Sequence, residues 1–413
     1  MAIHNDRGEA WDFDRRAKPS SKPAYHTTNT ADTVIASHTA EKSYVSEATR
    51  QLTRLSHAVG QDEQTRQKLL RALNFSAGPW ARDPVPESLD RSAWVSDVSN
   101  DHSPVEYSLA LDQRTGDVEV RFLIEAQPEE NNLTALQASV SQLSEDIAAE
   151  YNETVSLDSL NAIRDLFLPE NPEGTLVAWH SFAMSKTLEK WKIYLNPHAC
   201  GKINASRVTS EAMTRLGLES AWALLESIMS PDDYVIYCAL GLSRDPENAE
   251  VKVYVAHPGA SAMQIAEKHS AIDPESDSTA EILRFYNCMA GGSSGPYYLK
   301  PPISCFAFKR ENPLRVTRTA LFPMDSYAAH DAEAQERVEA YMDAFSAPAA
   351  YRERYFNGID AVRRRALDSG RGIHSWVSLK MKPDGKRSNC FYLSPELYGP
   401  LFDDGVVSDD KQM

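Results

Sequence analysis

The sequence is poor in the features that define disulfide-rich and membrane-spanning proteins. Its five cysteines (Cys200, Cys238, Cys288, Cys305 and Cys390) are scattered without a CxxC pair, so we expect reduced core thiols and no disulfide framework or zinc site. No apolar run approaches the ~18 residues of a membrane helix. The opening "MAIHNDRGEAWDFDRRAKPSSK" lacks the apolar core of a signal peptide. We therefore expect a cytoplasmic protein without a membrane partner.

Positive charge is also scarce. The 413 residues include 43 Lys and Arg against 59 Asp and Glu, a net charge of −16. Nucleic-acid binding requires a basic face, so this balance argues against a nucleic-acid partner.

Composition divides the chain into three parts. Residues 1–40 are polar and rich in Ser, Thr, Pro and charge, which predicts a disordered arm. Residues 401–413 predict an acidic, frayed tail. We expect residues 41–400 to form one folded domain.

Within this domain, five pairs of strand-like runs are each joined by a short polar turn. The runs are rich in β-branched and aromatic residues. They read VEYSLAL and VEVRFLIEA, GTLVAWHSFAM and KWKIYLNP, DYVIYCALGL and EVKVYVAH, PPISCFAF and LRVTRTALFP, and HSWVSLKM and RSNCFYLSP.

Helical stretches alternate with the hairpins. Apolar residues at helical spacing predict helices at 43–58, 62–74, 133–147, 210–229, 279–289 and 332–345. The pattern is a helix–hairpin repeat of about 60 residues, which also explains why Lys192 and Lys252 lie in similar contexts.

The fold class predicted from this repeat is α+β. Hairpins place consecutive strands antiparallel, and ten such strands in series can close into a barrel that has no edges. Helices with one apolar face would then form a ring around it. An open sheet, or two separate sheets, is the alternative.

Cations occur at matching positions on the second strand of three successive pairs: Arg121, Lys192 and Lys252. An outward lysine under a covering helix would be buried without a partner, which is costly. We therefore predict a ring of positive charge inside the barrel, suited to a diphosphate. Three exposed strand charges are the alternative.

Strand alternation places Tyr194 on the face of Lys192 and Tyr254 on the face of Lys252. Phenol rings stabilise nearby cations, so these positions suit a diphosphate ester that ionises to an allylic cation. Glu106, in the middle of the first aromatic strand, could accept a hydrogen bond from a heterocyclic N–H. An ordinary solvated carboxylate is the alternative for Glu106.

Together, "SPVEYSLAL", "VRFLIEA", "KWKIYLNPHACGK", "VKVYVAHPG", "FPMDSYAAHD" and "FYLSPELY" resemble the dimethylallyltryptophan synthase family of aromatic prenyltransferases, in its bacterial branch. The resemblance covers roughly residues 40–400. It implies the ABBA fold, a ten-stranded antiparallel barrel inside a ring of helices. It also implies transfer of a dimethylallyl group from its diphosphate to an indole, commonly that of tryptophan.

The resemblance assigns roles to individual positions. Glu106 matches the acid that holds the indole N–H, and Trp179 falls near the acceptor. Arg121, Lys192 and Lys252 match diphosphate ligands, and Lys192 counts with Glu106 as catalytic. The shield around the allylic cation corresponds to the following tyrosines: Tyr194, Tyr254, Tyr392 and, more loosely, Tyr398.

The chain departs from the family pattern at several positions. Glu250 stands where the third hairpin usually carries an Arg, so one diphosphate ligand is lost or replaced, with Arg315 or Arg318 as possible substitutes. Thr319 and Leu321 replace a usual Gln and Tyr, which opens apolar room. Trp179 replaces a lysine found in some members, which leaves the final base open; His180 is a candidate, although it faces away from Trp179.

The chain has no DDxxD motif, with which other prenyl-diphosphate enzymes bind magnesium: "SPDDYVIY" and "LFDDGV" stop at two acids. We therefore expect no metal and no cofactor, with basic side chains in the role of the ion. We expect a monomer or homodimer whose partners are a prenyl diphosphate and an indole. The alternatives are geranyl diphosphate as donor, an indole-lactam or cyclic dipeptide as acceptor, and a ligand-carrying barrel without catalysis.

Overall fold

The structure, a computed structural model, describes residues 42–92, 94–274 and 278–398. The arm predicted over residues 1–40 and the tail predicted over residues 401–413 lie outside the described residues. In the described part of the chain, no helix is both long enough and apolar enough to cross a membrane.

The ten predicted strands all form. Each pairs antiparallel with its neighbours in sequence, and β10 pairs with β1 to close the barrel. The strands are β1 (Val105–Asp112), β2 (Val118–Ile124), β3 (Ala178–Met184), β4 (Glu189–Leu195), β5 (Tyr234–Gly241), β6 (Val251–Ala256), β7 (Ile303–Phe308), β8 (Thr317–Pro323), β9 (His374–Met381) and β10 (Arg387–Leu393).

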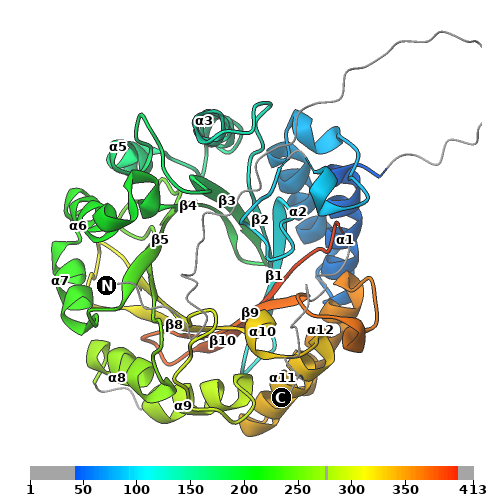
Figure 1. Ribbon diagram of the computed structural model, residues 1–413, viewed down its shortest axis with the longest axis vertical. Coiled ribbons are helices and arrows are strands. Elements are labelled where there is room, and N and C mark those ends of the chain that lie inside the picture. Colours follow the sequence, from blue (N-terminus) through cyan, green and yellow to red (C-terminus); the bar gives the residue numbers. More distant parts are fainter. Residues whose placement is uncertain (1–41, 93, 275–277, 399–413) are drawn as a thin grey trace, which may run out of the picture.

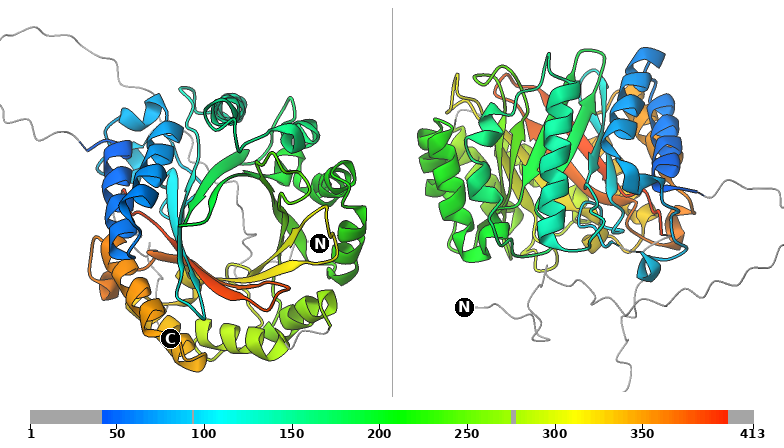
Figure 2. Two further views of the ribbon diagram at one scale, coloured as in Figure 1. Left: turned by 180° about the vertical axis from the view of Figure 1, so that it is seen from behind. Right: turned by 90° about the horizontal axis from the view of Figure 1, so that it is seen from above.

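Helices surround the closed barrel as a ring (Figure 1), and Figure 2 shows the same ring from behind in its left view. A group of helices precedes each hairpin, which confirms the helix–hairpin repeat and the predicted α+β barrel. The helices are α1 (Tyr44–Ala58), α2 (Glu63–Ser76), α3 (Leu133–Glu150), α4 (Asp158–Asn161), α5 (Arg164–Phe167), α6 (Ala205–Arg215), α7 (Glu219–Ile228), α8 (Ala262–Ile272), α9 (Ser278–Met289), α10 (Met324–Tyr327), α11 (Asp331–Ala344) and α12 (Ala349–Val362).

The helices differ from the prediction in two respects. The stretch 210–229, expected to be one helix, breaks into α6 and α7 because Gly217 adopts a φ of +69°, which ends a helix. Helices α8 and α12 were missed, as were the four-residue helices α4, α5 and α10. A capping box formed by Ser261 and Gln264 begins α8, and Pro348 precedes α12, so local signals for both helices are present in the sequence.

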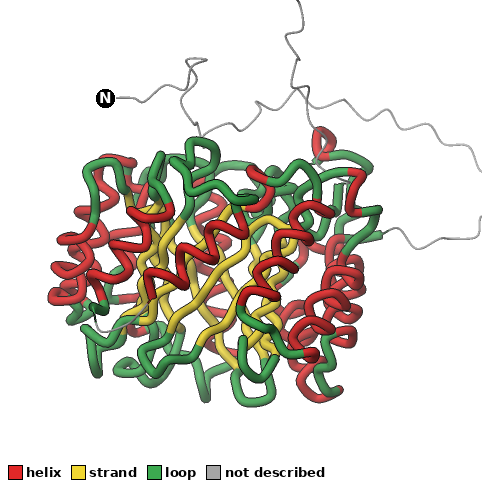
Figure 3. Tube along the Cα trace, turned by 90° about the horizontal axis from the view of Figure 1, so that it is seen from below, coloured by secondary structure: helices red, strands yellow, loops and turns green. Residues whose placement is uncertain are grey.

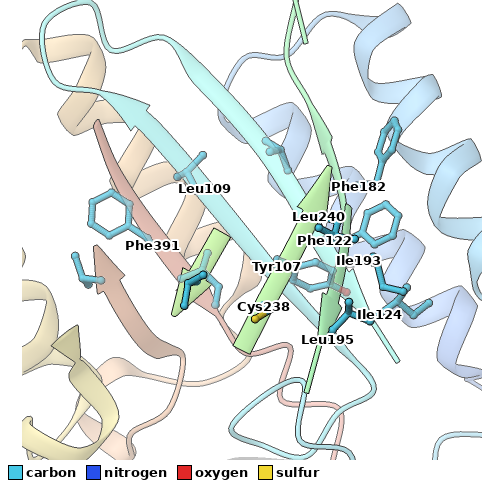
Figure 4. Packing of buried hydrophobic residues seen from close by; sticks show 14 of the residues in the cluster. Tyr107, Leu109, Phe122, Ile124, Phe182, Ile193, Leu195, Cys238, Leu240 and Phe391 are labelled. Carbon is cyan, nitrogen blue, oxygen red and sulfur yellow. The ribbon is translucent and has the colours of Figure 1, made fainter. Parts of the chain in front are cut away.

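The hydrophobic core lies between the outer face of the barrel and the helices, which cross over the strands in Figure 3. Outward side chains such as Phe122, Phe182 and Ile193 belong to this layer (Figure 4). The Phe182 ring centroid is 6.0 Å from that of Phe122 and 4.9 Å from that of Trp191. Because alternate residues of each strand are committed to this outer core, the remaining residues face the lumen.

Truncating Phe182 tests this outer core. Phe182 is completely buried, so Phe182→Ala should lower the free energy of unfolding by about 3–5 kcal/mol, through lost transfer energy and a residual cavity. Urea unfolding at equilibrium measures the loss. The matched control is Leu314→Ala, because Leu314 is 58% exposed and its truncation should cost less than about 0.5 kcal/mol. Equal losses for the two variants would contradict the assignment of the core.

Candidate active site

Eight of the predicted site residues face the lumen. Their immediate neighbours along the strands, including Tyr107, Trp191 and Val253, pack in the outer core. The strand register places luminal residues of neighbouring strands side by side; Tyr254 on β6, for example, lies opposite Tyr237 on β5. The eight are Glu106, Arg121, Trp179, Lys192, Tyr194, Lys252, Tyr254 and Tyr392.

The cations gather near one end of the barrel. The five hairpin turns, at 113–117, 185–188, 242–250, 309–316 and 382–386, lie at this end, which we call the hairpin end. Lys192 and Lys252 follow their turns closely, and Arg121 lies opposite Ser108 on β1. The structure adds Lys190 and Lys380, which sequence reasoning missed. Lys190 shares the alternation of Lys192, so its position could have been found from the sequence.

Two carboxylates lie among these cations. Glu119 forms an ion pair with Arg121. One oxygen of Glu250, Oε2, lies 3.0 Å from the Nζ of Lys190, 3.7 Å from that of Lys252 and 3.9 Å from that of Lys192. Glu250 therefore faces the lumen and pairs with three lysines. We call the seven residues the charge cluster: Arg121, Lys190, Lys192, Lys252, Lys380, Glu119 and Glu250.

The pKa values of the charge cluster show how strongly its members interact. Burial, together with the neighbouring ammonium groups of Lys252 and Lys190, holds the pKa of Lys192 well below its usual value. Burial also lowers the pKa of Lys380 to about 8. Burial opposes the charge of Lys252, but the Glu250 carboxylate outweighs it and raises the pKa of Lys252. When all seven members are ionised, the cluster carries a surplus of three positive charges, and a bound anion would favour this ionised state of Lys192 and Lys380.

Aromatic side chains occupy the middle of the lumen. The ring centroid of Tyr254 lies 5.9 Å from that of Tyr194 and 6.2 Å from that of Tyr237. The ring centroid of Tyr237 also lies 5.1 Å from that of Trp179. Tyr392 and Trp376 pack against the same group of luminal residues.

Sequence reasoning missed Tyr237 and Trp376. An irregular register between Val235 and Tyr237 disturbs the alternation of β5, which hides the luminal position of Tyr237. Leu321, predicted to open apolar room, lies opposite Ser378 and Ile303 in this part of the lumen.

Glu106 lies at the other end of the lumen, near the start of β1, where helices and loops connect the hairpins. We call this the connection end. Glu106 is 5% exposed, and its Oε2 accepts a hydrogen bond of 3.2 Å from the hydroxyl of Ser375. Burial raises the pKa of Glu106 to about 8. Trp179 lies nearby at the start of β3 and donates its indole N–H to Glu125.

Three candidates from the sequence lie outside the lumen. Tyr398 follows β10 and packs against α1, with its hydroxyl 3.1 Å from that of Tyr44, so its position does not suit a shield around a luminal cation. Arg318 points outward from β8 and donates to the carbonyl of His269, to Asp273 and to the hydroxyl of Ser278, which ties the barrel to α8 and α9. His180 also points outward and bonds Ser144 of α3, and burial lowers its pKa to about 3.

The remaining proposed substitute for the missing arginine, Arg315, is exposed in the turn between β7 and β8. Neither Arg315 nor Arg318 therefore replaces a luminal cation. Among residues 42–92, 94–274 and 278–398, no group of three or more His, Cys, Asp and Glu side chains is placed to hold a metal ion.

Comparison with known proteins agrees with this geometry. A model of the tryptophan dimethylallyltransferase family matches residues 40–357. The 6-dimethylallyltryptophan synthase from Micromonospora olivasterospora, solved in complex with DMASPP and Trp, has a TM-score of 0.77 at 27% identity. That match covers 87% of this chain and 100% of the other.

Two further structures extend the comparison. The prenyltransferase PriB, in a ternary complex with L-tryptophan and dimethylallyl thiolodiphosphate, has a TM-score of 0.76 at 26% identity, over 87% of this chain and 98% of that one. AnaPT from Neosartorya fischeri has a TM-score of 0.68 at 14% identity, over 84% and 91% of the two chains, which shows the fold alone.

The closed barrel, the ring of helices and the luminal charge cluster define an aromatic prenyltransferase of the ABBA type. Within that class, the chain belongs to the tryptophan dimethylallyltransferase family. The resemblance read from the hairpin motifs is thereby confirmed.

The raised pKa of Glu106 predicts a stability change that does not depend on activity. The folded carboxyl group keeps its proton up to about pH 8, whereas the pKa of an unperturbed glutamate is 4.5. The folded state therefore binds more protons between these values, and stability falls as pH rises from 4.5 toward 8.

Glu106→Gln cannot ionise and escapes this loss. Its melting temperature should equal that of the wild type near pH 4.5 and exceed it by roughly 3 °C or more at pH 8.5. Differential scanning calorimetry across this range measures the difference. Glu153→Gln, at an exposed position, serves as the control and should show no such trend. A constant offset for Glu106→Gln at both pH values would contradict the shifted pKa.

Proposed function

We propose that this protein transfers a dimethylallyl group from dimethylallyl diphosphate to the indole ring of L-tryptophan, by Friedel–Crafts alkylation. The family assignment supports this activity. Two similar structures contain tryptophan together with DMASPP or dimethylallyl thiolodiphosphate.

One observation carries the proposal: the lumen has a cationic end, an aromatic middle and a carboxylate at the opposite end. This order matches the two substrates laid end to end. The diphosphate would bind at the hairpin end, the allyl group would lie among the tyrosines, and the indole would reach Glu106. A carrier of apolar ligands has no need of this polarity, so the geometry favours an enzyme over the ligand-carrying barrel.

The charge cluster would act on the leaving group. As the C–O bond of the donor breaks, its electron pair passes to the diphosphate, where Arg121, Lys192 and Lys252 stabilise the developing negative charge. The structure brings Lys190 and Lys380 to the same end, and we include them in this role. Fixed ammonium groups inside a closed wall stabilise this charge more strongly than water does.

The tyrosines would protect the allylic cation. The rings of Tyr194, Tyr254 and Tyr392 present electron-rich faces and exclude water, and we add Tyr237 to this shield because its ring contacts that of Tyr254. A ring carbon of the indole then supplies the electron pair for the new C–C bond. The proton on that carbon leaves to water or to the released diphosphate, since His180 lies outside the barrel.

Glu106 would hold the acceptor. Its carboxylate accepts the indole N–H, which orients the ring and raises its electron density. With a pKa of about 8, Glu106 is ionised only in part near neutral pH, so acceptor binding should improve as pH rises.

The proposal also covers the compartment, the oligomeric state, the partners and the domain bounds. We propose a cytoplasmic enzyme that acts as a monomer or homodimer, without nucleic-acid or membrane partners and without metal. Residues 41–400 would form its single domain. Geranyl transfer and a tryptophan-derived acceptor are less favoured, since the similar structures named above contain tryptophan and dimethylallyl analogues.

Removing a luminal ammonium group tests the diphosphate site. Lys192→Met or Lys252→Met should lower kcat/KM by roughly 100-fold or more, because each removes a fixed charge that stabilises the departing diphosphate. Turnover with dimethylallyl diphosphate and tryptophan, followed by mass spectrometry, measures the loss. Lys68→Met is the control, since Lys68 forms a half-exposed ion pair with Glu189. Wild-type turnover in both luminal variants would refute the assigned role.

Glu250 should weaken the binding of the donor, because its carboxylate competes for the lysines that the diphosphate needs. Glu250→Gln removes one negative charge and should tighten the binding of dimethylallyl thiolodiphosphate by roughly tenfold. Isothermal titration calorimetry measures the affinity. Glu247→Gln, at an exposed position in the same turn, is the matched control. Weaker binding by Glu250→Gln would instead mean that the carboxylate is needed to hold the lysines in place.

A further inference from the structure

A charged cluster that the mechanism above does not use lies at the connection end. The Nζ of Lys300 is 2.9 Å from the side-chain oxygen of Asn100 and 3.6 Å from Oδ2 of Asp325. The amide nitrogen of Asn100 donates to the same Asp325 oxygen at 2.8 Å. The three residues come from the segment before β1, the segment before β7 and helix α10, so the fold assembles them from distant parts of the chain.

This cluster is continuous with the acceptor end of the lumen. The ammonium group of Lys300 lies over the ring of Trp376, 4.7 Å from its centroid. Trp376 packs on the luminal aromatic group, and the preceding residue, Ser375, donates to Glu106. Lys300 and Asp325 are both among the charges that act on the Glu106 carboxyl group. A chain of contacts therefore runs from the proposed indole anchor to the Lys300–Asp325 pair.

The pair retains capacity to bind a ligand. A lysine ammonium group has three donors, and among the described residues Lys300 uses one of them, on Asn100, within hydrogen-bond distance. The 3.6 Å separation from Asp325 is too long for a direct hydrogen bond. Their side chains are 22% and 14% exposed, so both are accessible without being free on the surface.

We propose that Lys300 and Asp325 form the subsite for the amino-acid group of the acceptor. Lys300 binds the α-carboxylate, Asp325 binds the α-ammonium group, and Asn100 holds the two side chains in place. This inference rests on the proposed function. An α-amino acid carries opposite charges on groups attached to one carbon, and an adjacent cation and anion at the site complement both.

A consequence for specificity follows from this complementarity. A cyclic dipeptide has neither a free carboxylate nor a free ammonium group. When it binds, it would displace the water that hydrates Lys300 and Asp325 without supplying a charged group to either side chain. Such unpaired charges are expensive to desolvate, which is how a polar subsite rejects an analogue that lacks the polar group. The pair would therefore select the free amino acid over a cyclised derivative.

Two variants and three acceptors test the assignment. Tryptamine lacks the carboxylate, and indole-3-propionate lacks the ammonium group. Lys300→Met should raise KM for tryptophan and indole-3-propionate by about tenfold or more, and should change KM for tryptamine by less than about twofold. Asp325→Asn should do the reverse, raising KM for tryptophan and tryptamine but not for indole-3-propionate.

The control variant is Lys202→Met, because Lys202 also lies over an aromatic ring, that of Tyr234 at 4.9 Å. It should leave all three KM values near those of the wild type. A loss that is equal for all three acceptors in Lys300→Met and Asp325→Asn would overturn the subsite, because it would indicate a structural role. Unchanged KM values would overturn it as well.

Failure of the proposed function looks different from failure of this inference. If the wild type alkylates none of the three indoles with dimethylallyl diphosphate, the proposed function is wrong. If the wild type alkylates tryptophan and the two variants show no dependence on the acceptor's charged groups, only the subsite is wrong.

Discussion

Like charges held together inside a closed barrel are the constraint on which the rest of this structure depends. Arg121 and four lysines lie together in the lumen, with Lys192 and Lys252 buried, and the repulsion and desolvation of these cations both oppose folding. Glu119 and Glu250 offset part of this cost, since each lies beside cations that would otherwise be unpaired. The cluster is left with a positive surplus, and under the proposed function the diphosphate of the donor would neutralise it and relieve the repulsion among the cations.

The architecture makes this arrangement possible by separating two tasks. Alternate residues of every strand pack outward against the helices and supply the hydrophobic core, as Phe122 and Phe182 do. The luminal side chains therefore do not have to form the hydrophobic core, and the lumen can be polar at both ends and aromatic between them. The hairpin turns mark the cationic end and the helical connections mark the end that holds Glu106, so under the proposed function the topology would set the direction of the bound substrates.

Much of this plan could be predicted from the sequence, because strand alternation and the hairpin repeat are local patterns. They placed Arg121, Lys192 and Lys252 in the lumen correctly, whereas the site position of Glu106 came from the resemblance to the family. The errors come from contacts that are not local. Tyr398 follows the last strand and turns toward α1, and Arg318 faces Asp273 in the segment after α8, neither of which its own neighbourhood reveals. The pairing of Glu250 with Lys190 and Lys192 of β4 depends on the register of β4, β5 and β6, and the irregular register of β5 hides Tyr237.

In the proposed function, the lumen binds the two substrates end to end, with the diphosphate at the hairpin end. A crystal structure of the protein with dimethylallyl thiolodiphosphate and L-tryptophan tests this arrangement most directly. We expect phosphate oxygens within hydrogen-bond distance of Arg121, Lys192 and Lys252, and the indole nitrogen within hydrogen-bond distance of Glu106. A diphosphate bound near Glu106, or bound outside the barrel, would contradict it.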